Sequence, residues 1–203
     1  MKKKILLFLS LYSLALFSSH GVAVTITLVP MSQEIRVGST TSVDLNISDL
    51  GDYSAPSLGA FLTEIVFDDV ALSFESVTYG DLLGSTEPSL FETDIVTTVT
   101  PGSVSLDEFS FLSDYELDSL QPDSFTLASL SFMATSAGTS LLEFGLIDLS
   151  DAIGFSILDP TLETASITVT PEHHTVPEPA TYILMLSGLV GIMGLKCRRH
   201  KGS

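Results

Sequence analysis

Carboxylates supply the only catalytic or metal-binding chemistry that the central part of this chain offers. The sequence has 203 residues, and its 25 Asp and Glu all lie between Glu34 and Glu178. Neither His nor Cys occurs between residues 24 and 172. A Ser-His-Asp triad, a Cys-His dyad and a histidine metal site are therefore excluded from this region, and no disulfide can form in it. Calcium ligation and the acid pair of a secreted hydrolase remain.

Three groups of acids are candidates for calcium binding. None of them follows the alternating oxygen spacing of an EF-hand loop or of a calcium-binding nonapeptide repeat. We therefore name no catalytic residue, no metal ligand and no cofactor, and calcium binding stays open without an assigned site. The candidates are Asp49 with Asp52, Asp68 with Asp69, and Asp148 with Asp151 and Asp159.

The basic residues are concentrated at the two ends of the chain. Only one of the eight Lys and Arg, Arg36, lies among the acids. A surface with this charge repels the phosphate backbone, so we expect no nucleic-acid partner. It suits a soluble domain in a medium that contains divalent cations.

The C-terminal segment combines an acidic motif between prolines, an apolar run and a basic end. The motif is Val176-Pro177-Glu178-Pro179, and its prolines favour an extended backbone that a membrane protease can grip. Ala180–Leu195 holds no charge, and as a helix it would measure about 24 Å, against a hydrocarbon core of about 30 Å. We predict that it crosses a membrane with its C-terminus in the cytoplasm, because cations follow it. These cations are Lys196, Arg198, Arg199 and Lys201.

Motif, apolar run and basic end together resemble a PEP-CTERM sorting signal over about residues 175 to 200. The resemblance implies that an exosortase, a membrane-embedded enzyme similar to cysteine transpeptidases, recognises and processes the protein. It also implies a Gram-negative host that makes exopolysaccharide. The alternative is an ordinary C-terminal membrane anchor that follows two prolines.

The N-terminus has the pattern of a secretory signal peptide. Lys2, Lys3 and Lys4 precede the apolar stretch Ile5–Phe17, and small residues follow at Gly21-Val22-Ala23. We predict cleavage between Ala23 and Val24. The protein is then exported, held briefly by its tail, and released to the cell surface or the extracellular matrix.

Short alternating segments with turn signals between them predict an all-β sandwich or jelly roll of about nine strands. The acidic stretch Asp107–Asp123 is expected to form a solvated loop rather than a metal site. No amphipathic helix is expected, although Asp114–Leu120 or residues 82–91 could form a turn of one. The expected strands are Val24–Val29, Ser42–Ser48, Phe61–Phe67, Leu72–Tyr79, Ile95–Thr100, Val104–Phe111, Phe125–Ala134, Ser140–Phe144, Ala152–Ile157 and Thr164–Thr170.

Three passages resemble cohesin-like domains, which are nine-stranded jelly rolls related to some carbohydrate-binding modules. They are Val37-Gly38-Ser39 leading into Val43–Ile47, the segment Leu58–Asp81, and Phe125–Phe132 with the following Ala137-Gly138-Thr139. The resemblance covers about residues 24 to 170. It implies the fold and a binding role, and it names no partner.

The sequence therefore predicts a signal peptide (1–23), a cohesin-like domain (24–171), a linker (172–175) and a sorting signal (176–201). We expect a non-enzymatic binding or structural protein of the cell envelope or exopolysaccharide matrix. Its expected partners are the exosortase and either exopolysaccharide or another envelope protein. A carbohydrate-binding module is one alternative, although the domain has no Trp and few Tyr for an aromatic platform: Tyr53, Tyr79 and Tyr115. A hydrolase that uses two carboxylates is the other.

Overall fold

The computed structural model describes residues 24–172 and residue 185. The signal peptide through Ala23, the motif Val176–Pro179, the apolar run apart from residue 185, and the basic residues from Lys196 to Lys201 lie outside the described residues. In the part of the chain that is described, no helix has the length and apolar character to cross a membrane.

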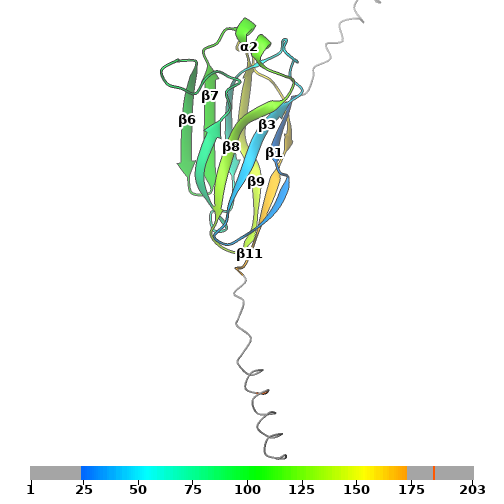
Figure 1. The fold of residues 1–203 in the computed structure, drawn as a ribbon. Coiled ribbons are helices and arrows are strands. Elements are labelled where there is room, and N and C mark those ends of the chain that lie inside the picture. The colour runs from blue at the N-terminus through cyan, green and yellow to red at the C-terminus, as the bar shows by residue number, and fades with distance from the viewer. Residues whose placement is uncertain (1–23, 173–184, 186–203) are drawn as a thin grey trace, which may run out of the picture. The chain divides into compact units, whose positions relative to one another are not determined.

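The described domain is built almost entirely from strands (Figure 1). This confirms the predicted all-β fold. The elements are β1 (Thr25–Val29), β2 (Ser32–Arg36), β3 (Thr40–Ser48), β4 (Leu58–Val66), β5 (Leu72–Tyr79), β6 (Thr93–Thr100), β7 (Ser103–Ser110), α2 (Asp114–Leu120), β8 (Phe125–Ala134), β9 (Gly138–Asp151), β10 (Thr161–Glu163) and β11 (Ala165–Thr170).

The strands form two sheets that pack face to face. The five-stranded sheet has the order β10-β1-β3-β8-β5, and the six-stranded sheet has the order β2-β11-β9-β4-β7-β6. Neighbouring strands run antiparallel, except that β10 pairs with β1 and β2 pairs with β11 in parallel. These two short outer strands, β2 and β10, were not predicted from the sequence.

Alternation along the strands places the core between the sheets. On β3, Val43, Leu45 and Ile47 are buried, with exposed fractions of 1 % or less. Phe132 on β8 is fully buried, and the rings of Phe67 and Phe74 pack edge-on against it, with centroid distances of 5.2 and 5.8 Å. Each large apolar side chain buried in this way stabilises the fold by about 1.5–3 kcal/mol.

The predicted strand Ala152–Ile157 is wrong, because the segment forms a tight loop. The Asp151 carboxylate accepts hydrogen bonds from the backbone N–H groups of Ile153 and Phe155, which curls the chain back on itself. The only strand-like pairing within these residues is an isolated bridge between Ser150 and Ser156. The alternation of Ile153, Phe155 and Ile157 imitates a strand, but two of these side chains point to solvent.

The solvated loop expected within Asp107–Asp123 is also wrong, and the helical alternative over Asp114–Leu120 is confirmed. The strand β7 continues to Ser110, and α2 then begins after Ser113. Ser113 and Glu116 form a reciprocal capping box, which satisfies backbone donors at the start of the helix. The hydrogen bonds from the backbone and hydroxyl of Ser113 lower the pKa of Glu116. Leu117 is buried and anchors the helix.

Candidate functional site

Three of the acids considered for calcium binding, Asp49, Asp68 and Asp151, accept hydrogen bonds from the protein itself. Asp49 accepts a hydrogen bond from the Thr25 hydroxyl at 2.9 Å, and Asp68 accepts one from the backbone N–H of Val70 at 2.9 Å. Asp151 holds the loop described above. Among residues 24–172, no group of three or more His, Cys, Asp or Glu side chains is arranged to hold a metal ion. Asp49, Asp68 and Asp151 thus hold turns or strand ends, whereas Asp148 lies within β9.

The three tyrosines considered for a sugar platform lie on three separate elements. Tyr53 lies in the loop between β3 and β4, and Tyr115 lies on α2, and both are well exposed. Tyr79 lies on β5, and its hydroxyl contacts the hydroxyl of Thr97 on β6 at 2.9 Å. Partial burial raises the pKa of Tyr79.

The outer face of the six-stranded sheet carries a row of four side chains in register. Val96, Asp107, Leu62 and Asp148 are neighbours across β6, β7, β4 and β9. Asp107 and Asp148 thus flank Leu62, and all three line a shallow hollow of about 280 Å³. No basic residue lines this hollow. We call it the acidic hollow.

Four large apolar side chains are exposed beside the acidic hollow, and we call them the apolar patch. Phe109, Phe111, Ile153 and Phe155 have exposed fractions of 51 %, 60 %, 65 % and 69 %. The rings of Phe109 and Phe111 pack edge-on with a centroid distance of 5.5 Å. Phe109 and Ile153 both line a second hollow of about 260 Å³, and Ser150 lines both hollows. Phe109 and Ile153 therefore adjoin the acidic hollow, and Phe111 packs against Phe109.

Strand phase and one carboxylate hold the apolar patch in place. On β7, Leu106, Glu108 and Ser110 are buried, so Phe109 must point outward. The backbone N–H of Phe111 donates to the carbonyl of Glu92 at 2.8 Å, which extends the pairing beyond β7. Asp151 Oδ1 accepts from the N–H of Ile153 at 3.1 Å and of Phe155 at 2.8 Å. These hydrogen bonds define the backbone conformation that presents the patch.

A buried amide locks the neighbouring helix onto the sandwich. Gln121 has no exposed surface, and its side chain bonds to the N–H of Leu58 at 2.7 Å and to the carbonyls of Leu58 at 2.8 Å and Leu82 at 3.0 Å. Ser57 also donates to Asp118 on α2 at 2.7 Å. Leu117 of α2 lines the same hollow as Phe109 and Ile153, so the helix forms part of the wall of that hollow.

Glu108 is a buried carboxyl group next to the patch in sequence, but it faces the interior. It has no exposed surface, and neither carboxyl oxygen has a hydrogen-bond partner. Burial raises its pKa to about 8, so it is mostly neutral at pH 7. It contacts no solvent and therefore cannot meet a substrate.

None of the patch residues was predicted from the sequence to bind a partner. Phe109 lies inside a predicted strand, but which of the alternate side chains of that strand face solvent depends on which side of it the opposite sheet covers. Ile153 and Phe155 were assigned to a strand that does not form.

Comparison with known proteins identifies both parts of the chain. The family model of the PEP-CTERM protein-sorting motif matches residues 175–200. Among curated proteins, none matches the chain significantly.

Several solved cohesins resemble the domain. A type I cohesin from Pseudobacteroides cellulosolvens matches with a TM-score of 0.57 and 17% identity over 77% of this chain and 97% of that one. A type I cohesin–dockerin complex from Clostridium thermocellum matches with a TM-score of 0.57 and 15% identity over 73% and 94%. A non-cellulosomal cohesin from Archaeoglobus fulgidus matches with a TM-score of 0.55 and 17% identity, and the match covers 73% of this chain and 91% of that one.

Identities this low establish a common fold and nothing further about partners. The chain therefore unites a cohesin-type jelly roll with a PEP-CTERM protein-sorting motif at residues 175–200.

Proposed function

We propose that the domain is a protein-binding module and that the apolar patch with the acidic hollow is its docking surface. The single observation that carries this proposal is that the exposed side chains of Phe109 and Ile153 line a hollow that adjoins the acidic hollow through Ser150. Aromatic anchors beside a polar rim are the usual anatomy of a protein interface. Support also comes from the fold, since a cohesin that resembles this domain was solved in complex with a dockerin.

The charge of the surface indicates what the partner presents. Asp107 and Asp148 lie beside the patch, and Arg36 is the sole basic residue between residues 24 and 172. A partner surface with one large apolar side chain and nearby Lys or Arg would complement it. Such complementarity speeds association and selects the partner, and the apolar anchors supply most of the affinity.

The sorting motif indicates where in the cell the domain would meet its partner. We infer that an exosortase recognises Val176–Pro179 and processes the chain, which delivers the domain to the outside of the cell. There it binds its partner as a non-catalytic component of the envelope or matrix. The absence of His and Cys between residues 24 and 172 supports a role without catalysis.

Two variants of the purified domain test the docking surface against envelope proteins of the host. Replacing both Phe109 and Phe111 by Ala removes the two rings and leaves the core intact, because both are more than half exposed. Met133→Ala on the outer face of the other sheet, where Met133 is 36 % exposed, is the matched control. We expect the double variant to weaken binding at least about thirtyfold, which corresponds to about 2 kcal/mol.

Equal binding by the double variant and the control would remove this surface from the proposal. Binding of the wild-type domain to host exopolysaccharide, with no protein ligand, would instead favour the carbohydrate-binding alternative.

A further inference from the structure

The strand β6 forms one edge of the six-stranded sheet, and a single charged side chain, Asp94, is its only usual edge protection. Its sequence is Thr-Asp-Ile-Val-Thr-Thr-Val-Thr, without Pro, Lys or Arg. It pairs with β7 over all eight residues without a bulge. Natural proteins blunt such edges with short strands, bulges, proline or lysine, because an open edge can pair with another chain.

The other three edges of the sandwich are protected in these ways. The strand β10 has three residues, β5 has a register shift between Phe74 and Ser76, and β2 has five residues and carries Arg36. The edge at β6 is thus the exception within one domain.

The register shows which backbone groups of β6 are free. Thr100 pairs with Ser103 around the two-residue turn Pro101-Gly102, and residues that flank such a turn exchange their backbone hydrogen bonds. At the other end of β6, the hydrogen bond from the Phe111 N–H to the Glu92 carbonyl follows the same alternation, in which even-numbered residues bond to β7. The N–H and C=O groups of Ile95, Thr97 and Val99 therefore point away from β7, toward the open edge.

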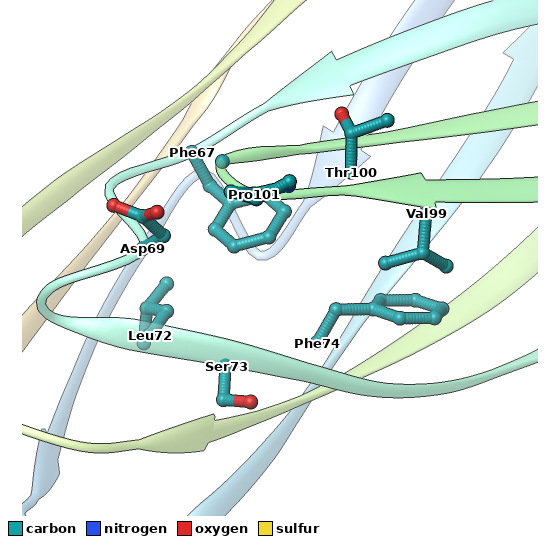
Figure 2. A pocket seen from close by; sticks show the side chains of 9 residues that line it. Phe67, Asp69, Leu72, Ser73, Phe74, Val99, Thr100 and Pro101 are labelled. Carbon is teal, nitrogen blue, oxygen red and sulfur yellow. The ribbon is translucent and has the colours of Figure 1, made fainter.

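A groove lies directly beside this edge. It has a volume of about 310 Å³, and it separates the β6–β7 turn from the β5 strand (Figure 2). Phe67, Leu72, Phe74 and Val99 give it an apolar lining, and Asp69 stands at its side. Figure 2 shows the Val99 side chain directed toward the ring of Phe74.

We propose that β6 accepts an extended segment of a partner protein as an added strand. The three free residues of β6 would bond to its backbone, and every second side chain of the segment would point into the groove. The groove selects an apolar side chain there, and Asp69 selects Lys or Arg close to it. This surface is separate from the apolar patch, so either can fail without the other.

A second copy of this chain fits the edge poorly. Two copies would bring together domains in which acids surround a single Arg36 between residues 24 and 172. Like charge on both surfaces opposes that pairing. A basic extended segment is favoured by the same charge.

A displayed library of random octapeptides, selected on the wild-type domain, tests the edge. Thr97→Pro removes one outward backbone N–H and also the hydroxyl that contacts Tyr79. Thr97→Val removes the same hydroxyl but keeps the N–H, so it is the matched control. We expect enriched peptides that alternate apolar side chains and carry Lys or Arg. Their binding should survive Thr97→Val and weaken at least about tenfold with Thr97→Pro.

Synthetic peptides give a second measurement on the unaltered protein. N-methylation of alternate residues on one edge of a selected peptide should abolish binding, and N-methylation on the other edge should leave it intact. The proposal is overturned if no peptide is enriched, if both methylated peptides bind equally, or if Thr97→Pro and Thr97→Val bind alike. A concentration-dependent dimer that disappears with Thr97→Pro would overturn it in favour of self-pairing.

Discussion

The carboxylate of Asp151 accepts the backbone N–H of Phe155 at 2.8 Å, and the Asp151 N–H donates to the Phe155 carbonyl at 2.9 Å. These two residues close the loop that presents Ile153 and Phe155 to solvent. A single acid therefore shapes half of the apolar patch. Without this carboxylate, the loop would become ordered only on binding, and the lost conformational entropy would weaken the affinity.

Asp151→Ala should weaken partner binding several-fold while the domain stays folded. The loop lies outside the core, so the melting temperature should change little. Asp151→Asn keeps a side-chain oxygen that can accept the same hydrogen bonds, and it should bind nearly as well as the wild type. Titration calorimetry of the three proteins with the identified partner measures the effect. Equal affinity of the Ala and Asn variants would show that the loop needs no such support.

The buried Glu108 should make the domain less stable as pH rises. Its pKa is about 8 in the folded state, above the ordinary value of 4.5. The folded protein therefore binds a proton that the unfolded chain releases between these values. The resulting stability is complete below about pH 4.5, falls by up to about 1.4 kcal/mol per pH unit, and is lost above about pH 8.

Urea unfolding of the wild type and of Glu108→Gln at pH 5 and pH 8 separates this effect from that of the other acids. The variant should gain stability relative to the wild type as pH rises, because its amide does not ionise. A constant difference between the two proteins would mean that Glu108 does not titrate in this range.

Gln121→Ala should destabilise the domain by about 3 kcal/mol or more, since it leaves two buried backbone groups of Leu58 and the partly buried carbonyl of Leu82 without their partner. The matched control is Ser119→Ala on α2, which removes one exposed bond to the Glu116 carbonyl. It should cost less than about 1 kcal/mol. Chemical denaturation measures both changes, and similar losses would contradict the anchoring role of Gln121.

The sorting motif predicts a shortened protein outside the cell. Mass spectrometry of the secreted protein should find a C-terminus close to Pro177–Pro179. A mature chain that still carries residues 196–203 would show that the tail is an ordinary anchor.

Most strands of the two sheets could be predicted from the sequence, but the surface that they present could not. Alternation of Val43, Leu45 and Ile47 with polar neighbours predicts a strand with one buried face, and Pro101-Gly102 predicts the turn into β7; both are found. Gly102 adopts a φ of 77°, which glycine accepts readily. The short outer strands β2 and β10 depend on pairing with distant partners, so local pattern does not reveal them.

The candidate site was missed for a related reason. Phe109 is outward because Leu106, Glu108 and Ser110 meet the core, and that phase is a tertiary property. The sequence around Ile153 has the alternation of a strand, but the hydrogen bonds to the Asp151 carboxylate fold it into a loop. Glu108 is buried although charged residues usually face solvent, so the alternation of apolar and polar residues does not reveal which face of β7 is buried.

Site-specific photo-crosslinking in the host tests the central claim, protein binding through the apolar patch, most directly. A photoreactive phenylalanine analogue at position 155 should crosslink one defined protein partner, and the same analogue at position 133 on the opposite sheet should not. Loss of the crosslink when Phe109 and Phe111 are both replaced by Ala would tie it to the patch. Crosslinking from position 133 but not from position 155, or no protein crosslink from position 155, would contradict the account.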